Sequence, residues 1–189
     1  MKRNYTPWII GGIILLLVLL VIGSYNGLVG KRNNVDSAWA DVQAQYQRRM
    51  DLIPNLVATV KGYAAHEEDL FTEITQLRSQ WQTASASGDT AGAITAAQGT
   101  DSALARLLVV AEAYPDLKAS TNFLALQDEL AGTENRVAVA RTRFNDAVKT
   151  YNTAIQTFPR NILAGMFGFE PKTFFAAAAG SENAPQVTF

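Results

Sequence analysis

The chain has 189 residues, of which 48% are hydrophobic and 17% are charged, with a formal net charge of −1 and no cysteine. Basic and acidic residues are interspersed, so the sequence lacks the basic stripe of a nucleic-acid-binding protein and we expect no nucleic-acid partner. The absence of cysteine excludes disulfides, zinc–thiolate sites and thiolate catalysis. With His66 as the only histidine and no phosphate-binding glycine motif, we expect no metal, no cofactor and no enzymatic activity.

An apolar run occupies the N-terminal part of the chain, where residues 8–22 contain no polar side chain. Fifteen helical residues cover only about 22 Å, and flanking residues from Tyr5 to Val29 extend the run toward the roughly 30 Å of a hydrocarbon core. We therefore predict an uncleaved transmembrane anchor over residues 1–29. A cleaved signal peptide is the alternative, although no A-x-A-like cleavage site follows the run.

Charges on the two sides of this run are nearly balanced. Lys2 and Arg3 precede it, and Lys31 and Arg32 follow it, which leans weakly toward an exported domain. Gly23 and Gly27 have the small-x-x-x-small spacing that lets membrane helices approach closely, so they are candidates for contacts between membrane helices. A flexible exit from the bilayer is the alternative interpretation of the same residues.

A heptad pattern dominates the next part of the sequence. Two mostly apolar rows hold one register from Leu28 to Trp81, which predicts a single long helix covered by other helices. Pro54 lies within this pattern, and because the register is the same on both sides of it we expect a kink and not a reversal of the chain.

Later segments supply the covering helices. A Ser/Gly-rich turn at residues 84–89 precedes an alanine-rich stretch, residues 90–99, that we expect to be a short or poorly fixed helix. A helix then runs from Asp101 or Ser102 to Pro115. The last long helix starts at Ser120 or Thr121, ends at Pro159, and has a heptad row beside a row of alanines that suits antiparallel packing: Phe123, Leu130, Val137, Phe144, Tyr151 and Phe158.

These patterns predict an all-α protein, in which an N-terminal transmembrane helix continues into a long-helix antiparallel bundle of about four to five helices. The bundle domain would span residues 30–175, and residues 176–189 would form an irregular C-terminal tail. Residues 161–175 are rich in aromatic and aliphatic side chains, so we expect them to close one end of the bundle, with an interfacial membrane contact as the alternative.

Polar residues interrupt the apolar rows and are the candidates for a site. The main interpretation is a set of ion pairs that fix the register of the helices, and the alternative is a functional polar pocket. Arg49 is expected to pair with Glu134 or Glu112. The full set of candidates for this polar seam or for partner binding is Arg49, Asp51, Glu112, Glu134, Asn145 and Asn152.

Four longer blocks of the sequence have a distinctive composition: Arg48-Arg49-x-Asp51-Leu52-Ile53-Pro54-Asn55-Leu56-Val57, Lys61-Gly62-Tyr63-Ala64-Ala65-His66-Glu67, Glu112-Ala113-Tyr114-Pro115-Asp116-Leu117-Lys118-Ala119 and Ala184-Pro185-Gln186-Val187-x-Phe189. With these blocks the chain resembles the LemA family. The chain departs from the family at Ala176 to Ala179, where a more acidic segment is usual, so a role for acidic residues there is in doubt.

The resemblance implies a bacterial single-pass plasma-membrane protein with an α-helical domain in the cytoplasm and no established enzymatic activity. This sidedness is opposite to the lean of the charges. A family member involved in forming the magnetosome membrane favours a role in organising membrane. Our first hypothesis is a membrane-anchored homo-oligomeric scaffold that organises the bilayer or membrane proteins, and the alternative is an adaptor that binds a partner protein through its bundle.

Overall fold

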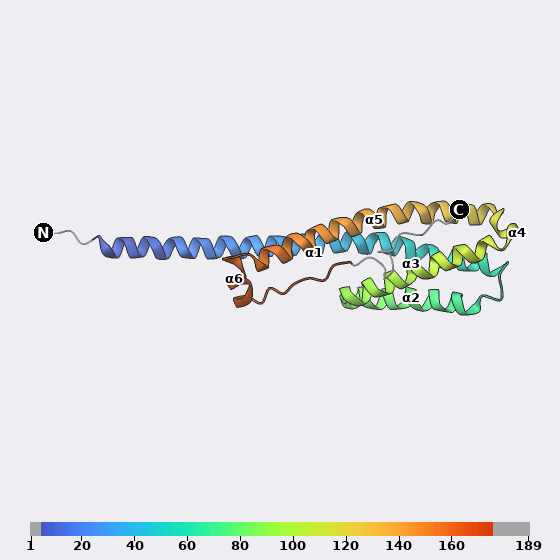
Figure 1. Cartoon of the computed structure of the whole chain (residues 1–189), viewed down its shortest axis with the longest axis horizontal. Coiled ribbons are helices and arrows are strands. Elements are labelled where there is room, and N and C mark those ends of the chain that lie inside the picture. Colours follow the sequence, from blue (N-terminus) through green and yellow to red (C-terminus); the bar gives the residue numbers. More distant parts are fainter. Residues whose placement is uncertain (1–4, 176–189) are drawn as a thin grey trace, which may run out of the picture. The chain divides into compact units, whose positions relative to one another are not determined.

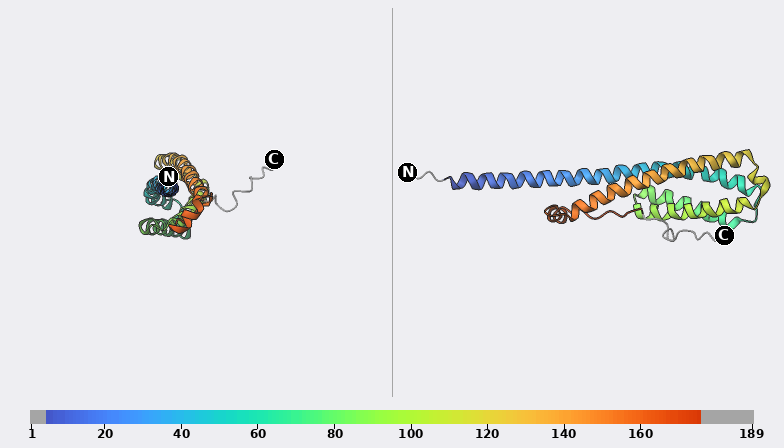
Figure 2. Two further views of the ribbon diagram at one scale, coloured as in Figure 1. Left: turned by 90° about the vertical axis from the view of Figure 1, so that its left-hand side faces the viewer. Right: turned by 45° about the horizontal axis from the view of Figure 1, so that its top comes forward.

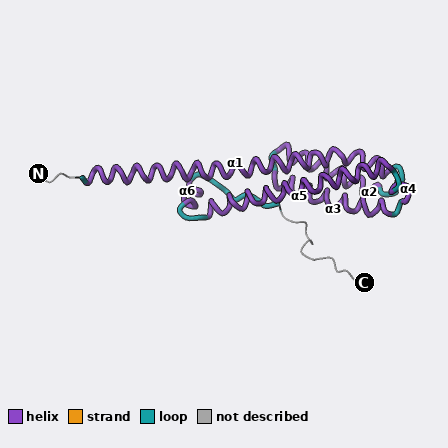
Figure 3. The backbone as a smooth tube through the Cα atoms, turned by 90° about the horizontal axis from the view of Figure 1, so that it is seen from above, coloured by secondary structure: helices purple, strands orange, loops and turns teal. Residues whose placement is uncertain are grey.

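A computed structural model describes residues 5–175 of the chain, and this described part is helical with no strands (Figures 1 and 3). The all-α prediction is therefore confirmed. Lys2 and Arg3, as well as the predicted tail at residues 176–189, lie outside the described residues. The helices are α1 (Thr6–Lys61), α2 (Glu68–Ser87), α3 (Thr90–Glu112), α4 (Pro115–Lys118), α5 (Thr121–Gln156) and α6 (Arg160–Met166).

Helix α1 contains the one stretch of the described residues that is long and apolar enough to cross a membrane, with a mean hydropathy of 2.5. Its apolar side chains are exposed all round the helix from Trp8 to Ile22. Exposed leucines and isoleucines on every face of a helix are stable in hydrocarbon and costly in water, which makes this stretch a candidate membrane span. Pro54 lies inside α1 and does not end it.

The expectation of one helix from Leu28 to Trp81 is wrong, because α1 ends at Lys61 and α2 begins at Glu68. The turn begins with Gly62, a poor helix former, and the amides of Tyr63 and Ala64 both donate to the carbonyl of Val60 at 3.0 and 2.9 Å. The loop between α1 and α2 has a length that keeps the buried residues of α2 in the same heptad register as those of α1. A heptad count therefore cannot detect this turn.

A tight connection joins α2 to α3. Gly88 ends α2 in the left-handed region at φ 74°, and Asp89 caps α3 by accepting a 2.9 Å hydrogen bond from the amide of Gly92. The expectation of a separate weak helix at residues 90–99 is wrong, since α3 is continuous from Thr90. Its small residues allow α2 to pack closely: a Cβ atom at Gly99 would lie 2.6 Å from Cδ2 of Leu77.

The predicted inner row of α5 is buried from Phe123 to Tyr151. The helix stops at Gln156, before the expected end, and Phe158 is 76% exposed. The heptad pattern therefore identified the inner face of α5 but placed one residue too many on it.

Contacts divide the described chain into two compact units. The first unit comprises residues 5–39 and 143–174, and its core includes Leu28, Val35, Phe144, Val148, Tyr151 and Phe169. The second unit comprises residues 40–142 with Phe175, and its core packs parts of α1 and α5 with α2, α3 and α4 through Val42, Ile53, Leu56, Ile74, Trp81, Leu107, Leu117 and Phe123. Within the second unit, α2 lies beside α3 (Figure 2).

Candidate functional site

A buried arginine lies at the centre of the second unit. Arg49 on α1 is 1% exposed, and its guanidinium donates to Asp101 of α3 through Nη1 and to Glu134 of α5 through Nη2. It occupies the same heptad row as Val42 and Leu56, so the helix directs this side chain inward. Because a buried charge is tolerated only when it is paired, the two carboxylates allow the arginine to occupy a core position.

Asp101 joins the polar side chains of this cluster. Its carboxylate accepts hydrogen bonds from Arg49, from Arg141 of α5 and, at 3.1 Å, from the hydroxyl of Tyr46. Burial raises the pKa of Asp101 to about 7, the nearby charge of Glu134 acts in the same direction, and the guanidinium of Arg49 opposes both. Burial also lowers the pKa of Arg141 from its ordinary value.

Aromatic rings close one side of the cluster. The ring of Tyr46 lies 5.6 Å from the guanidinium carbon of Arg49 and 5.3 Å from that of Arg141. Phe175 stacks on Tyr46 with centroids 6.0 Å apart, and Arg141 lies 4.5 Å from the centroid of Phe175. Cation–π contacts of this kind add to the ion pairs, so the cluster ties α1, α3 and α5 together in the second unit.

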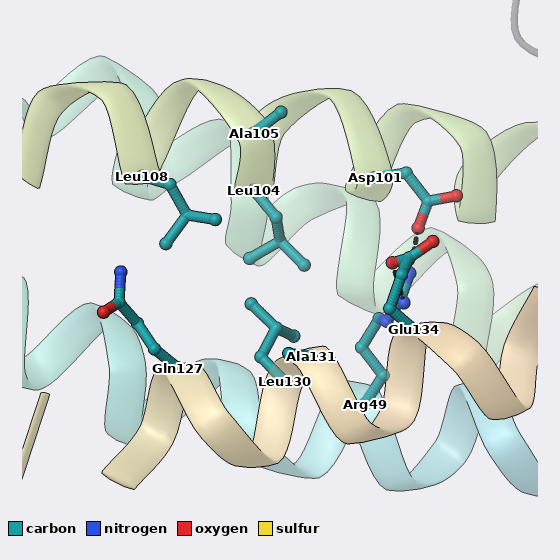
Figure 4. Close-up of a pocket in the computed structure, with 9 residues that line it drawn as sticks. All are labelled: Arg49, Asp101, Leu104, Ala105, Leu108, Gln127, Leu130, Ala131 and Glu134. Carbon is teal, nitrogen blue, oxygen red and sulfur yellow. Dashed lines mark hydrogen bonds and ion pairs between the residues drawn. The ribbon is translucent and has the colours of Figure 1, made fainter. Parts of the chain in front are cut away.

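A cavity of about 340 Å³ lies beside the cluster, between α3 and α5 (Figure 4). Arg49, Asp101 and Glu134 form one end of it and Gln127 lies near the other. Its apolar walls are Leu104, Ala105, Leu108, Leu130 and Ala131. Leucine walls with a charged end suit an apolar group that carries a hydrogen-bonding function.

Arginines occupy the carboxylates of this cluster. In residues 5–175 no three side chains of the histidine, aspartate or glutamate type are grouped so as to hold a metal ion. Asp101 and Glu134 already accept hydrogen bonds from arginines. His66 is exposed in the loop between α1 and α2.

The structure brings together only some of the residues singled out from the sequence. Arg49 pairs with Glu134, whereas Glu112 is exposed at the end of α3. Asp51 is exposed and accepts a 2.8 Å hydrogen bond from Gln47 of its own helix. Asp101 was interpreted as the start of a helix and not as a site residue. Its position three residues before Leu104, on the apolar face of α3, is the signal that identifies it as partly buried.

Asn145 and Asn152 belong to the first unit. The side chain of Asn152 donates to the carbonyl of Lys172 at 2.8 Å and accepts from its amide at 2.9 Å. The hydroxyl of Tyr151 donates to the carbonyl of Glu170 at 3.0 Å, and Lys172 lies 3.6 Å from Asp36. These contacts fix the segment that follows α6.

Gly23 and Gly27 both lie on α1. A Cβ atom added at either position would meet no other atom within 4 Å. Side chains of the described residues therefore leave this face of the helix open, and its predicted role in contacts between membrane helices stays a prediction.

Comparison with known proteins identifies relatives over most of the chain. The LemA family model matches residues 38–189. Magnetosome protein MamQ of Magnetospirillum gryphiswaldense is 25% identical over 185 residues, covering 86% of this chain and 68% of MamQ. Protein LemA of Metamycoplasma hominis is 26% identical over 149 residues, covering 79% of this chain and 67% of that protein. Together with the candidate span, these relatives fit a bacterial membrane protein.

Proposed function

Because the chain belongs to the LemA family and its first helix is long and apolar enough to cross a bilayer, we propose that the protein is a membrane-anchored helical scaffold. In this proposal copies of the chain associate with one another and organise the bilayer or other membrane proteins. The protein is a single-pass protein of the bacterial plasma membrane, with no catalytic activity and no nucleic-acid partner.

The observation that carries the proposal is the make-up of α1. One helix of 56 residues contains both the exposed apolar stretch and a buried face from which Trp39 and Arg49 contact α5. The sequence favours helical packing over a reactive centre, because one histidine and no cysteine leave little catalytic chemistry. The membrane-organising role that the LemA family resemblance implies supports the proposal.

Energy transfer between differently labelled copies of the full-length protein in lipid vesicles tests self-association. We expect transfer to persist when the vesicles are fused with an excess of protein-free lipid, because a bound pair stays together on dilution. Transfer that falls in proportion to the surface density of protein would contradict the proposal.

The cavity beside Arg49 favours a second candidate function, that of an adaptor which holds a partner protein in the groove between α3 and α5. Ala105 and Ala131 are exposed on its walls, so Ala105→Trp and Ala131→Trp fill the groove without changing the core. We expect both variants to lose crosslinks to the partner in cells, while Ala138→Trp, at an exposed position of α5 outside the groove, keeps them. Unchanged crosslinks in all three variants would exclude the groove as the binding site.

A further inference from the structure

The first unit exposes a cluster of large apolar side chains around α6. Phe158 is 76% exposed, Ile162 55%, Met166 73% and Phe167 50%. Ile162 and Met166 are four residues apart and share one face of α6, whereas Ala164 is buried. One side of α6 therefore packs on the unit while the other presents apolar side chains that the described residues leave uncovered.

Ring contacts hold this cluster beside α1, close to the end of its apolar run. The ring of Tyr25 lies 4.9 Å from that of Phe167 and 5.8 Å from that of Phe169. Tyr25 follows Ile22 by three residues, which is about 4.5 Å along a helix. The guanidinium of Arg32 lies 5.5 Å from the centroid of Phe169. In Figures 1 and 3, α6 lies beside α1.

Basic side chains flank the same cluster. Lys31, Lys149 and Arg160 line one shallow surface together with the hydroxyls of Thr150, Thr153 and Thr157, and Asp146 is the single acidic residue on it. Two further acidic residues of this unit are Asp36, which lies 3.6 Å from Lys172, and Glu170, which is exposed. Cations next to exposed aromatic and aliphatic side chains are the combination that binds the surface of an anionic bilayer.

We propose that residues 158–167 lie in the interface of the bilayer that α1 spans, with Phe158, Ile162, Met166 and Phe167 at the boundary between headgroups and acyl chains. Lys31, Lys149 and Arg160 face the headgroups of anionic phospholipids. This surface therefore contacts the bilayer itself, because the ring contacts of Tyr25 place the cluster one helical turn from the end of the apolar run. The inference is independent of self-association.

The absence of cysteine allows single-cysteine labelling of the full-length chain to test this placement. Ile162→Cys and Met166→Cys carry an environment-sensitive nitrobenzoxadiazole probe in vesicles of phosphatidylcholine, with or without phosphatidylglycerol. Arg143→Cys is the control, because it is exposed on α5 next to Phe144, whose ring lies 5.2 Å from that of Trp39. Trp39 is 17 residues beyond Ile22, about 25 Å along α1.

We expect nitroxide-labelled lipids to quench the probes at positions 162 and 166 several-fold more than the probe at 143, and phosphatidylglycerol to increase this difference. Equal quenching by aqueous iodide at all three positions would show that the cluster lies in water and would overturn the proposal. Shielding from iodide without quenching by nitroxide lipids would show that protein covers it, which also overturns the proposal.

The basic residues are tested separately in the Met166→Cys background. Lys31→Gln, Lys149→Gln and Arg160→Gln together should abolish the increase caused by phosphatidylglycerol and leave quenching in phosphatidylcholine unchanged. An increase that survives all three substitutions would contradict the role of these residues in binding anionic lipid.

Discussion

Arg49 occupies a position that every neighbouring heptad assigns to an aliphatic side chain, and its two carboxylate partners come from two other helices. Removing the guanidinium leaves Asp101 with one fewer cation and opens a gap in the core. We expect Arg49→Ala to lower the free energy of unfolding by about 3 kcal/mol or more.

The adjacent residue provides a matched control for this prediction. Arg48 pairs with Glu129 at 3.0 Å, and both side chains are about half exposed. Arg48→Ala should cost less than about 1 kcal/mol. Denaturant unfolding of the full-length protein in mild detergent, followed by circular dichroism of the helices, measures the free energy of unfolding of both variants. Equally small decreases in the two variants would show that the Arg49 cluster stabilises the protein no more than the exposed ion pair does.

Asp101 makes stability depend on pH. Its pKa is about 7 in the folded protein against 3.8 for an ordinary aspartate, so between these values the folded state holds a proton that the unfolded state lacks. The stability that this group contributes is therefore greatest below pH 3.8 and falls as pH rises toward about 7.

Asp101→Asn should flatten the corresponding part of the stability profile between pH 4 and pH 7, since the amide does not titrate. Asp128→Asn, at an exposed position of α5, should leave the profile as it is in the wild type. Melting temperatures across this range measure how stability changes with pH. An Asp101→Asn profile parallel to that of the wild type would show that Asp101 is not the source of this pH dependence.

Sequence analysis identified Arg49 and Glu134 as candidate partners because both stand on or near inward-facing rows. It did not identify Asp101, whose position near the expected start of a helix concealed its place on the apolar face of α3. Tyr46 lies seven residues before Ile53 in one of the two heptad rows, and nothing in the pattern indicates that its hydroxyl donates to Asp101. Pairings between helices depend on the register of one helix against another, which periodicity within each helix does not specify.

For the individual helices, the heptad pattern predicted which faces are buried but did not predict where the chain turns. Pro54 is the residue that most suggests a break, yet α1 passes through it, whereas the turn lies at Gly62. Alanine-rich residues 90–99 lack large anchors and are nonetheless helical, because α2 packs closely against them. Alanine also has the highest helix propensity, so local preference and packing both favour helix at residues 90–99.

Gly23 and Gly27 on α1 allow a test of contacts between the helices of different copies. If this face carries contacts between copies, Gly23→Leu together with Gly27→Leu should reduce energy transfer between labelled copies several-fold, because the larger side chains keep the helix backbones apart. Gly11→Leu is the matched control, since Gly11 also lies in open space but points to a different side of α1. A reduction of the same size in the control would show that the effect is not specific to this face.

For the molecule as a whole, the sequence predicted an all-α chain with one N-terminal candidate span, and the structure confirms this fold class. The boundaries at residues 29 and 175 stay predictions, since the contacts group the described chain into the two units given above. Each unit contains segments that are distant in the sequence. Their pairing does not alter the periodicity of either segment, so periodicity does not predict it.

The sharpest test of self-association is the mass of the full-length protein in a gentle detergent and in lipid discs. Light scattering measures this mass, and negative-stain images show whether the particles are uniform. We expect one defined oligomer whose mass is several times that of the 20.5 kDa chain. A monomer in every detergent and in lipid discs would contradict it.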